Sequence, residues 1–398
     1  MKIKKFLALI IVAVLLSTIS VFSCAEGEAG ALYDINGTLL SEEDVYFYRE
    51  ATAVFGEYIH SGQNVKLSID LPIQKRTQEL LNEYPDGCAV VLDVNNGAPL
   101  ALAAVGDADP LMSTYSPDQL FMPCTALAAL NLGIIDIQDT IACEGVFTRY
   151  EQDGIAPECW IWNSAADQHL THGEECVETA LSDHCQYFFY CLGNDLGIDE
   201  IEKYARSLGL GEASGIEFEE STGVLASRSL KTMEEPWRIG DTLETAVGRG
   251  DSSFTALQLA RYCAAIAGSG KVYSASVLAE VSSLDGELLY QREPVIISKA
   301  AEMEENKWLA VRNGMYMSMY MSMYDPARIT CGIYDGEQAM VGFCSENEEE
   351  TSGEYLFIGY APWYKPEIAM AIVLHDAPSA DAVRQLAWEI FQAYKELL

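Results

Sequence analysis

The sequence predicts an α/β (α+β) fold with a central antiparallel sheet, helices on both of its faces and an all-helical subregion. Two apolar runs joined by Asn96-Gly97 predict an early β-hairpin. Three apolar runs beyond residue 338 predict three late strands, and residues 117–269 carry blocks with helical spacing. Both ends of the chain should therefore supply strands to one sheet, with the helical blocks inserted between them.

Each element follows from its own local pattern. Residues 65–70 alternate as a strand does, and Pro72 sits near the first turn of the helix that follows, where its missing N–H costs nothing. Ser379 is a suitable N-cap for the last helix. The expected elements are strands at 65–70, 87–94, 98–105, 339–344, 354–360 and 368–374, and helical segments at 71–81, 117–135, 174–210, 254–269 and 379–398.

The N-terminus predicts export. Lys2, Lys4 and Lys5 precede an apolar run from Phe6 to Phe22, as in a secretory signal. Residues 1–23 are either a signal peptide or an uncleaved membrane anchor, and Cys24 closes a segment that resembles a lipoprotein cleavage box. We expect residues 24–63 to be a short extracytoplasmic lead-in and residues 64–398 to form one large domain. The chain would then be tethered to the outer face of the cytoplasmic membrane through its N-terminus.

The charge of the chain excludes one class of partner. The formal net charge is −36, from 60 acidic and 24 basic residues. Nucleic-acid binding needs a basic surface, so we expect no nucleic acid as a partner. Direct adhesion to anionic lipid headgroups is disfavoured for the same reason.

The cysteines predict thiols or a disulfide rather than a metal site. The chain has 11 cysteines and no Cys-x-x-Cys pair, so we expect no metal and no cofactor. Export permits disulfides, and Cys143 and Cys159, which flank a polar loop, are the best candidate pair. His169 and His172, three residues apart, are interpreted as structural.

A series of landmarks resembles the transpeptidase domain of penicillin-binding proteins, especially the class B type. These landmarks are Leu67 to Gln74, the hairpin at 87–104, His172-Gly173, the segment 246–260 and the last two strands. The resemblance implies a penicillin-binding protein/serine β-lactamase-like fold over residues 64–398. Gly30 to Leu40 resembles the start of the family's N-terminal pedestal, but too few residues follow for a complete one.

The resemblance also places three active-site motifs, and all three are degenerate. Gln119 and Met122 stand where the family has the Ser and Lys of Ser-x-x-Lys, and no Ser-x-x-Lys occurs elsewhere in the chain. The Ser-x-Asn motif falls on His184 and Gln186, and the Lys-Thr-Gly motif on 343–345. A Gln amide is no nucleophile and a Met is no base, whereas acyl transfer needs both. The degenerate cleft positions are Gln119, Met122, His184, Gln186, Phe343 and Ser345.

We therefore expect a transpeptidase homologue without catalytic activity, which acts as a scaffold or regulator in peptidoglycan synthesis. Its partners would be cell-wall synthesis proteins or peptidoglycan peptides. Two alternatives stay open: an active D,D-transpeptidase or carboxypeptidase that binds penicillin, and a non-covalent sensor of wall peptides or β-lactams. Cys185 beside His184 suggests a thiol nucleophile, but adjacent residues face apart on a helix. The Met/Tyr repeat at 315–324 is interpreted as core filling.

Overall fold

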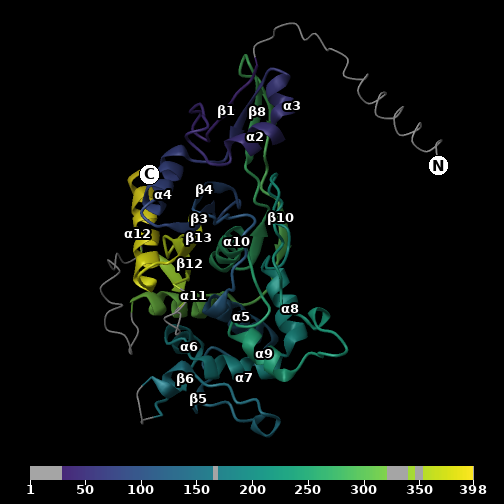
Figure 1. Ribbon diagram of the computed structural model, residues 1–398, viewed down its shortest axis with the longest axis vertical. Helices are drawn as coiled ribbons and strands as arrows, with labels where there is room; N and C mark the ends of the chain where they lie inside the picture. The colour runs from purple at the N-terminus through teal and green to yellow at the C-terminus, as the bar shows by residue number, and fades with distance from the viewer. Residues whose placement is uncertain (1–28, 165–168, 321–338, 346–352, 398) are drawn as a thin grey trace, which may run out of the picture.

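The central sheet is antiparallel and is built from both ends of the chain, as predicted. The computed structural model describes residues 29–164, 169–320, 339–345 and 353–397. Within them, one sheet has the strand order β11-β12-β13-β3-β4 (Figure 1). Its strands are β3 (Asp86–Asp93), β4 (Pro99–Val105), β11 (Val341–Cys344), β12 (Tyr355–Ala361) and β13 (Ile368–His375).

The hairpin between β3 and β4 turns at the predicted Asn-Gly. Gly97 has φ of +72°, a conformation that glycine adopts without strain. The Gly97 N–H donates to the carbonyl of Asp93 at 2.8 Å, and the Asp93 carboxylate accepts from the N–H of Asn95. Pairing of Val90 with Ala371 then joins this early hairpin to the late strands.

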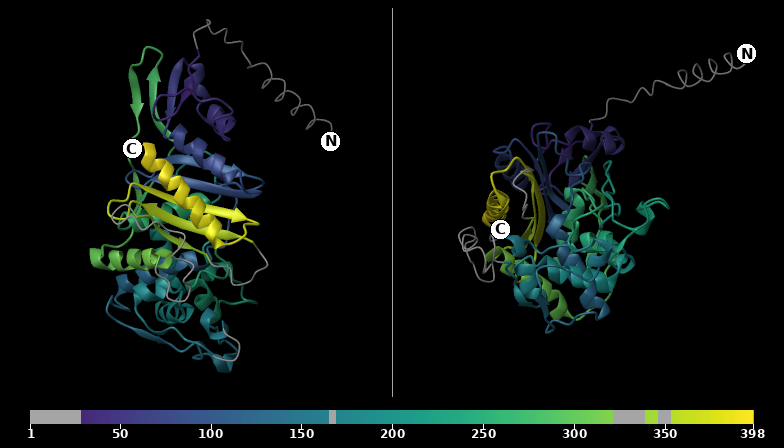
Figure 2. Two further views of the ribbon diagram at one scale, coloured as in Figure 1. Left: turned by 90° about the vertical axis from the view of Figure 1, so that its left-hand side faces the viewer. Right: turned by 60° about the horizontal axis from the view of Figure 1, so that its bottom comes forward.

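Alternate strand residues face two separate cores, as the two-residue period of a strand requires. Val90 on β3 belongs to the larger core and its neighbour Val91 to the smaller one. Helices α4 (Leu71–Leu81) and α12 (Ala380–Leu397) cover the face with Val91, and α10 (Ala256–Ala267) covers the other. Figure 2 shows α12 lying across the sheet, and the predicted helices on both faces are confirmed.

The helical subregion lies below the sheet in Figure 1. Its central helix, α5, is buried along almost its whole length, which explains its uniformly apolar sequence. The Met/Tyr repeat begins in α11, where Met315 and Met319 are buried as predicted, whereas residues 321–324 lie outside the described part. The helices are α5 (Met122–Leu132), α6 (Val177–Ser182), α7 (Gln186–Leu196), α8 (Ile198–Ser207), α9 (Ile239–Ala246) and α11 (Glu305–Tyr320).

A second sheet, absent from the sequence prediction, joins the lead-in to the middle of the chain. Its strand order is β1-β2-β8-β9, with β1 parallel to β2. Around Asn36-Gly37 the chain forms the short strand β1 and a single bridge between Tyr33 and Leu39. The elements are β1 (Leu32–Tyr33), α2 (Tyr48–Val54), α3 (Gly56–His60), β2 (Gln63–Leu67), β8 (Leu278–Ser283) and β9 (Leu288–Gln291).

Shorter elements complete the described chain. Two small antiparallel pairs, β5 with β6 and β7 with β10, flank the helical subregion and the second sheet. They are β5 (Ile141–Cys143), β6 (Gly173–Glu175), β7 (Lys271–Tyr273) and β10 (Ile296–Lys299), with short 3-10 turns η1 (Asp118–Phe121), η2 (Glu151–Asp153), η3 (Trp160–Asn163) and η4 (Arg228–Leu230).

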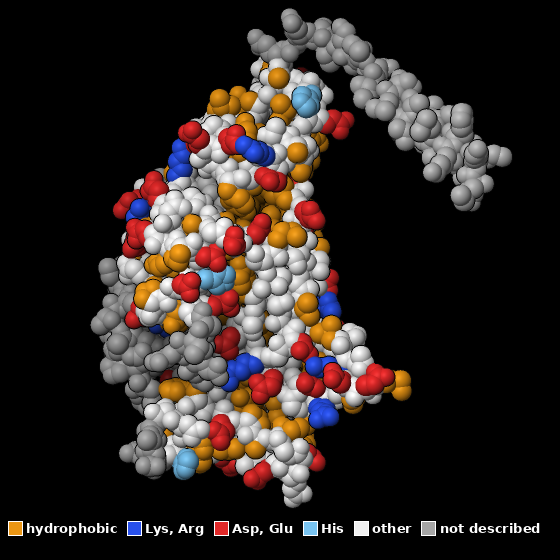
Figure 3. Space-filling view, viewed as in Figure 1, with side chains coloured by type: hydrophobic (Ala, Val, Ile, Leu, Met, Phe, Trp, Pro, Cys, Tyr) orange, Lys and Arg blue, Asp and Glu red, His pale blue; other side chains and the backbone are white. Residues whose placement is uncertain are grey.

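The predicted signal segment and Cys24 lie outside the described residues. Among the residues that are described, no helix is both long enough and apolar enough to cross a bilayer. Acidic side chains are spread over the face shown in Figure 3, in keeping with the net charge of −36.

Candidate functional site

The six predicted cleft positions lie where the helical subregion meets the edge strand β11. Gln119 is in η1, and Met122 opens α5 directly after it. His184 connects α6 to α7, and Gln186 is the first residue of α7. Phe343 lies on β11, and Ser345 directly follows that strand.

Three of the six positions converge on one another. The His184 ring contacts the Gln119 side chain, with Nδ1 2.6 Å from Oε1. Because an amide oxygen only accepts, Nδ1–H must donate, and Nε2 then accepts the hydroxyl of Ser318 at 2.8 Å. The ring also stacks on Phe343, with centroids 4.5 Å apart and planes 6° apart. His184 is therefore held on both nitrogens and on one face.

Local backbone geometry fixes this arrangement. Asp118 and His184 both have positive φ, 43° and 52°, which is uncommon for residues other than glycine and concentrates at functional sites. Gly248 packs so closely on η1 that a Cβ there would lie 1.6 Å from the carbonyl oxygen of Asp118. Arg249 adds an ion pair with the Asp118 carboxylate at 3.6 Å. The loop at 248–249 thus sets the position of η1 and of Gln119.

The other three positions serve packing or backbone contacts. The Met122 side chain is fully buried among apolar neighbours. Gln186 turns away from His184, and its Oε1 accepts the N–H of Trp160 at 2.8 Å. The Ser345 hydroxyl accepts the N–H of Leu356 at 2.9 Å on the neighbouring strand. The Met122 thioether and the Gln186 amide offer neither a nucleophile nor a base, and the Ser345 hydroxyl is engaged by the backbone of Leu356.

The space at this junction is small and acidic. Each of the six side chains is at most 3% exposed. The hollow beside them measures about 190 Å³, and its described lining residues are Ser116, Asp118, Ser345, Glu354 and Leu356. Two carboxylates line it among the described residues, with Arg249 beside Asp118 and His375 beside Glu354.

The alternative of a Cys185 nucleophile finds no support in this geometry. Burial raises the pKa of the Cys185 thiol well above its ordinary value, so the thiol stays protonated and unreactive. Both nitrogens of His184 are already engaged by Gln119 and Ser318. Cys185 instead points into a different cluster.

That cluster comprises Cys143, Cys159, His172 and Cys185. One donor atom from each lies within 4.8 Å of the others, and all four residues are buried. Both Cys143 and Cys159 are free thiols, so the predicted disulfide between them is not formed. Hydrogen bonds from Cys159 and Cys185 lower the pKa of Cys143, which favours a thiolate there.

The donor set fits a metal ion, contrary to the prediction that none would bind. Three thiols and one imidazole are the ligand types that Zn²⁺ takes in four-coordinate structural sites. The sequence signal was weak because the four ligands lie in separate segments: Cys143 ends β5, His172 precedes β6, Cys159 and Cys185 precede η3 and α7, and no Cys-x-x-Cys pair marks them. Of the two histidines interpreted as structural, His172 belongs to this cluster, whereas the ring of His169 stacks on Trp162 with centroids 4.4 Å apart.

Residues 87–320 match the penicillin binding protein transpeptidase domain. This match spans more than half of the chain. The chain belongs to the penicillin-binding protein transpeptidase family. The predicted resemblance and the predicted fold class are thereby confirmed, whereas the assignment of the six positions to the family's motifs stays a prediction.

Similar proteins place the chain within this penicillin-binding protein family. The peptidoglycan D,D-transpeptidase MrdA of Haemophilus influenzae is 24% identical over 80% of this chain and 54% of its own length. The PBP2 structure from Pseudomonas aeruginosa superposes with a TM-score of 0.77 at 19% identity, over 92% of this chain and 96% of that one. The structure of PBP2 with MreC from Helicobacter pylori gives 0.66 at 19% identity, over 84% of this chain and 64% of that one.

These similarities cover only part of the length of the curated relatives. The chain spans about half the length of the curated relatives that it matches. At the identities found, the solved penicillin-binding protein structures establish the fold of this chain. What this chain does must therefore be argued from its own residues.

Proposed function

We propose that this chain is a penicillin-binding-protein-like component of peptidoglycan synthesis that has lost acyl transfer and acts by binding other proteins of that machinery. The observation that carries this proposal is the set of contacts around His184. Gln119 and Ser318 hold its nitrogens, and Phe343 covers its ring. In an active member, this space must admit a peptide and a reactive hydroxyl.

The predicted cleft positions lack the groups that acyl transfer requires. The nucleophile position carries the amide of Gln119, and the base position carries the buried thioether of Met122. The position expected to bind the substrate carboxylate carries Phe343, and the adjacent hollow is lined by Asp118 and Glu354. This argues against an active transpeptidase, and the burial of all six cleft positions also argues against a sensor of wall peptides or β-lactams in the old cleft.

The proposed partners are proteins of the cell-wall synthesis complex. Two of the similar solved structures are of such assemblies, PBP2 with MreC from Helicobacter pylori and a peptidoglycan synthase complex. Export and an N-terminal tether, proposed from residues 1–24, would place this chain beside such partners at the outer face of the cytoplasmic membrane. A scaffold role requires the fold and its surface and leaves the acyl-transfer groups dispensable.

Binding to an MreC-type protein from the same organism tests the role. Biolayer interferometry should give saturable binding that is unchanged by excess penicillin, because no acyl-enzyme forms. The Met112→Ala variant, altered at an exposed side chain, is the matched control for handling and folding. Absence of binding to both MreC-type and synthase proteins would contradict the scaffold role. Release of D-alanine from a pentapeptide would show that the cleft is catalytically active.

A further inference from the structure

A pocket separate from the His184 cleft lies between the end of α8, the loop after it, α10 and β10. Its volume is about 420 Å³. Arg206 and Arg261 supply positive charge, Ser207 and Ser298 supply polar atoms, and Val272 and Ile297 form an apolar wall. Two arginines in one pocket are notable in a chain with 24 basic residues against 60 acidic ones.

Arg261 is a buried cation whose outer nitrogens lack partners. Its side chain comes from α10 and is 2% exposed. Nε donates to the carbonyl of Tyr273 at 3.3 Å, whereas Nη1 and Nη2 have no hydrogen-bond partner among the described residues. Leaving such donors unsatisfied is costly, more so when the group is charged. Burial accordingly lowers the pKa of Arg261 to about 10.

Arg261 is one of the residues that line the pocket, and its guanidinium lies next to the wall at Gly209. A Cβ added at Gly209, which forms part of the pocket wall, would lie 3.7 Å from Nη2. Gly209 has φ of +88°, so the chain turns there in a conformation that glycine adopts without strain. The absence of a side chain at 209 keeps the wall thin beside Arg261.

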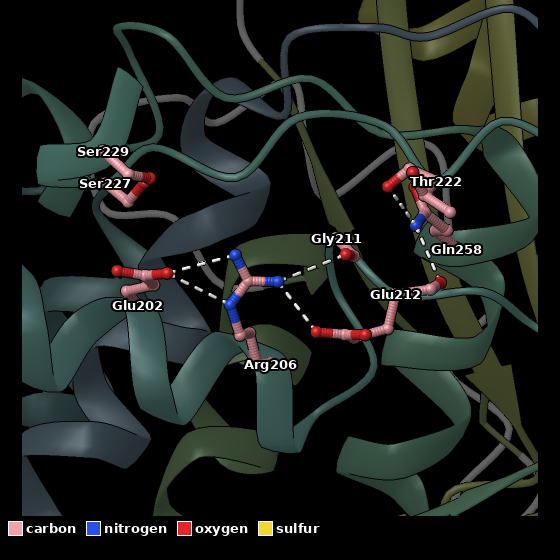
Figure 4. Close-up of polar contacts among 8 residues, drawn as sticks. All are labelled: Glu202, Arg206, Gly211, Glu212, Thr222, Ser227, Ser229 and Gln258. Atoms are coloured by element: carbon pink, nitrogen blue, oxygen red, sulfur yellow. Dashed lines mark hydrogen bonds and ion pairs between the residues drawn. The ribbon is translucent and has the colours of Figure 1, made fainter. Parts of the chain in front are cut away.

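Arg206, at the same pocket, already has its counter-charges. Its guanidinium lies between the carboxylates of Glu202 and Glu212, at 3.0 and 2.7 Å, and also donates to the carbonyl of Gly211 (Figure 4). Glu220 attracts Arg261 electrostatically, but its oxygens accept the backbone N–H groups of Ser214 and Gly215. Of the two arginines, Arg261 is therefore the one whose Nη1 and Nη2 have no hydrogen-bond partner among the described residues.

We propose that this pocket binds a small organic carboxylate, with its two oxygens on Nη1 and Nη2 of Arg261 and its apolar part against Val272 and Ile297. The planar guanidinium fork matches a carboxylate in a paired geometry. The volume lies in the range of small-molecule sites and far exceeds that of a simple ion. The acidic neighbours Glu202 and Glu212 disfavour ligands with several negative charges, such as phosphate.

Isothermal titration calorimetry with three probes tests the assignment. N-acetylalanine should bind saturably at millimolar concentration, its neutral primary amide should not bind, and inorganic phosphate should bind more weakly. Ile297→Glu, in the pocket wall, should weaken N-acetylalanine binding about tenfold or more by like-charge repulsion. Ile296→Glu is the matched control: it is the neighbour on β10, it is similarly exposed (49% against 45%), and it does not line the pocket.

The proposal is overturned by any of several results. These are equal binding of the amide, equal affinity of the Ile297→Glu and Ile296→Glu variants, binding of phosphate alone, or no saturable binding of N-acetylalanine. Arg261→Met should abolish binding while melting curves report whether it folds. Because Ile297 is exposed, its variant keeps the test decisive even where Arg261→Met unfolds.

Discussion

The His184 imidazole lies flat on the Phe343 ring, with their centroids 4.5 Å apart and their planes 6° apart. Phe343 comes from the edge strand of the sheet and His184 from the helical subregion, so this contact joins the two halves of the domain at the predicted cleft positions. The flat aromatic pair fills the space at this junction.

The stack should contribute to stability. Phe343→Ala removes a fully buried aromatic side chain and should lower the free energy of unfolding by about 3–5 kcal/mol. A double-mutant cycle with His184→Ala should give a coupling of about 0.5–1.5 kcal/mol. Urea denaturation measures both. Tyr364→Ala, at a residue that is 74% exposed, should change stability by less than about 0.5 kcal/mol, and a similar loss in that control would contradict the stack's role.

Placing a lysine at position 122, where the resemblance predicts the family's base, should lower the stability of this protein. Met122→Lys places an unpaired ammonium at a fully buried position and should cost about 3–5 kcal/mol of stability. Met112→Lys is the matched control, because its side chain is 45% exposed and should change stability little. Equal melting temperatures for the two variants would show that position 122 can admit solvent, contrary to the closed site.

The Cys143, Cys159, His172 and Cys185 cluster should bind zinc in the protein as isolated. Elemental analysis should find about one Zn²⁺ per chain, and strong chelators should lower the melting temperature because metal binding stabilises the folded state. Cys143→Ser should lose the metal, whereas Cys263→Ser, at a buried thiol outside the cluster, should retain it. Identical zinc content in both variants would show that this cluster is not the zinc site.

Acid stability should depend on Asp86. Burial acts to raise the pKa of this carboxyl, but hydrogen bonds from His375 and from the N–H groups of Ala108 and Asp107 outweigh it, so the pKa is lowered. A lowered pKa gives stability that is full above the unfolded value of about 3.9 and is lost as pH falls through the folded value.

The Asp86→Asn variant tests this dependence. Asp86→Asn should cost about 1–3 kcal/mol near neutral pH and should flatten the fall in stability below pH of about 4. Melting temperatures measured across pH report the difference, with the exposed Asp107→Asn as the control. An unchanged acid profile in Asp86→Asn would contradict the assignment.

The main sheet and its covering helices were predictable because their apolar patterns are long and regular. Strands β3 and β13 are buried on both faces, so their sequences are almost wholly apolar. Strands β8 and β9 gave no such signal, since β9 is exposed throughout and β8 has a single buried residue. Pairing of β8 with β2 and of β9 with β8 holds these strands in a sheet, and a local sequence pattern does not reveal such pairing.

The candidate site was predictable only in part. The resemblance placed Gln119, His184 and Phe343, which do lie together. Ser318 was missed because it sits in a Met-rich repeat that is correctly interpreted as buried, and helical spacing alone does not reveal its contact with His184. The Cys and His cluster was missed because its ligands come from separate segments of the chain, which only the fold brings together.

Labelling of the purified chain with a fluorescent penicillin is the direct test of whether this protein has lost acyl transfer. We expect no covalent label, because Gln119 and Met122 supply neither a nucleophile nor a base. The Gln119→Ser, Met122→Lys double variant should also stay unlabelled, because Phe343 still fills the space beside His184. An active penicillin-binding protein serves as the positive control. A label on the unaltered chain that survives denaturation and maps to a side chain would show that the protein still carries out acyl transfer.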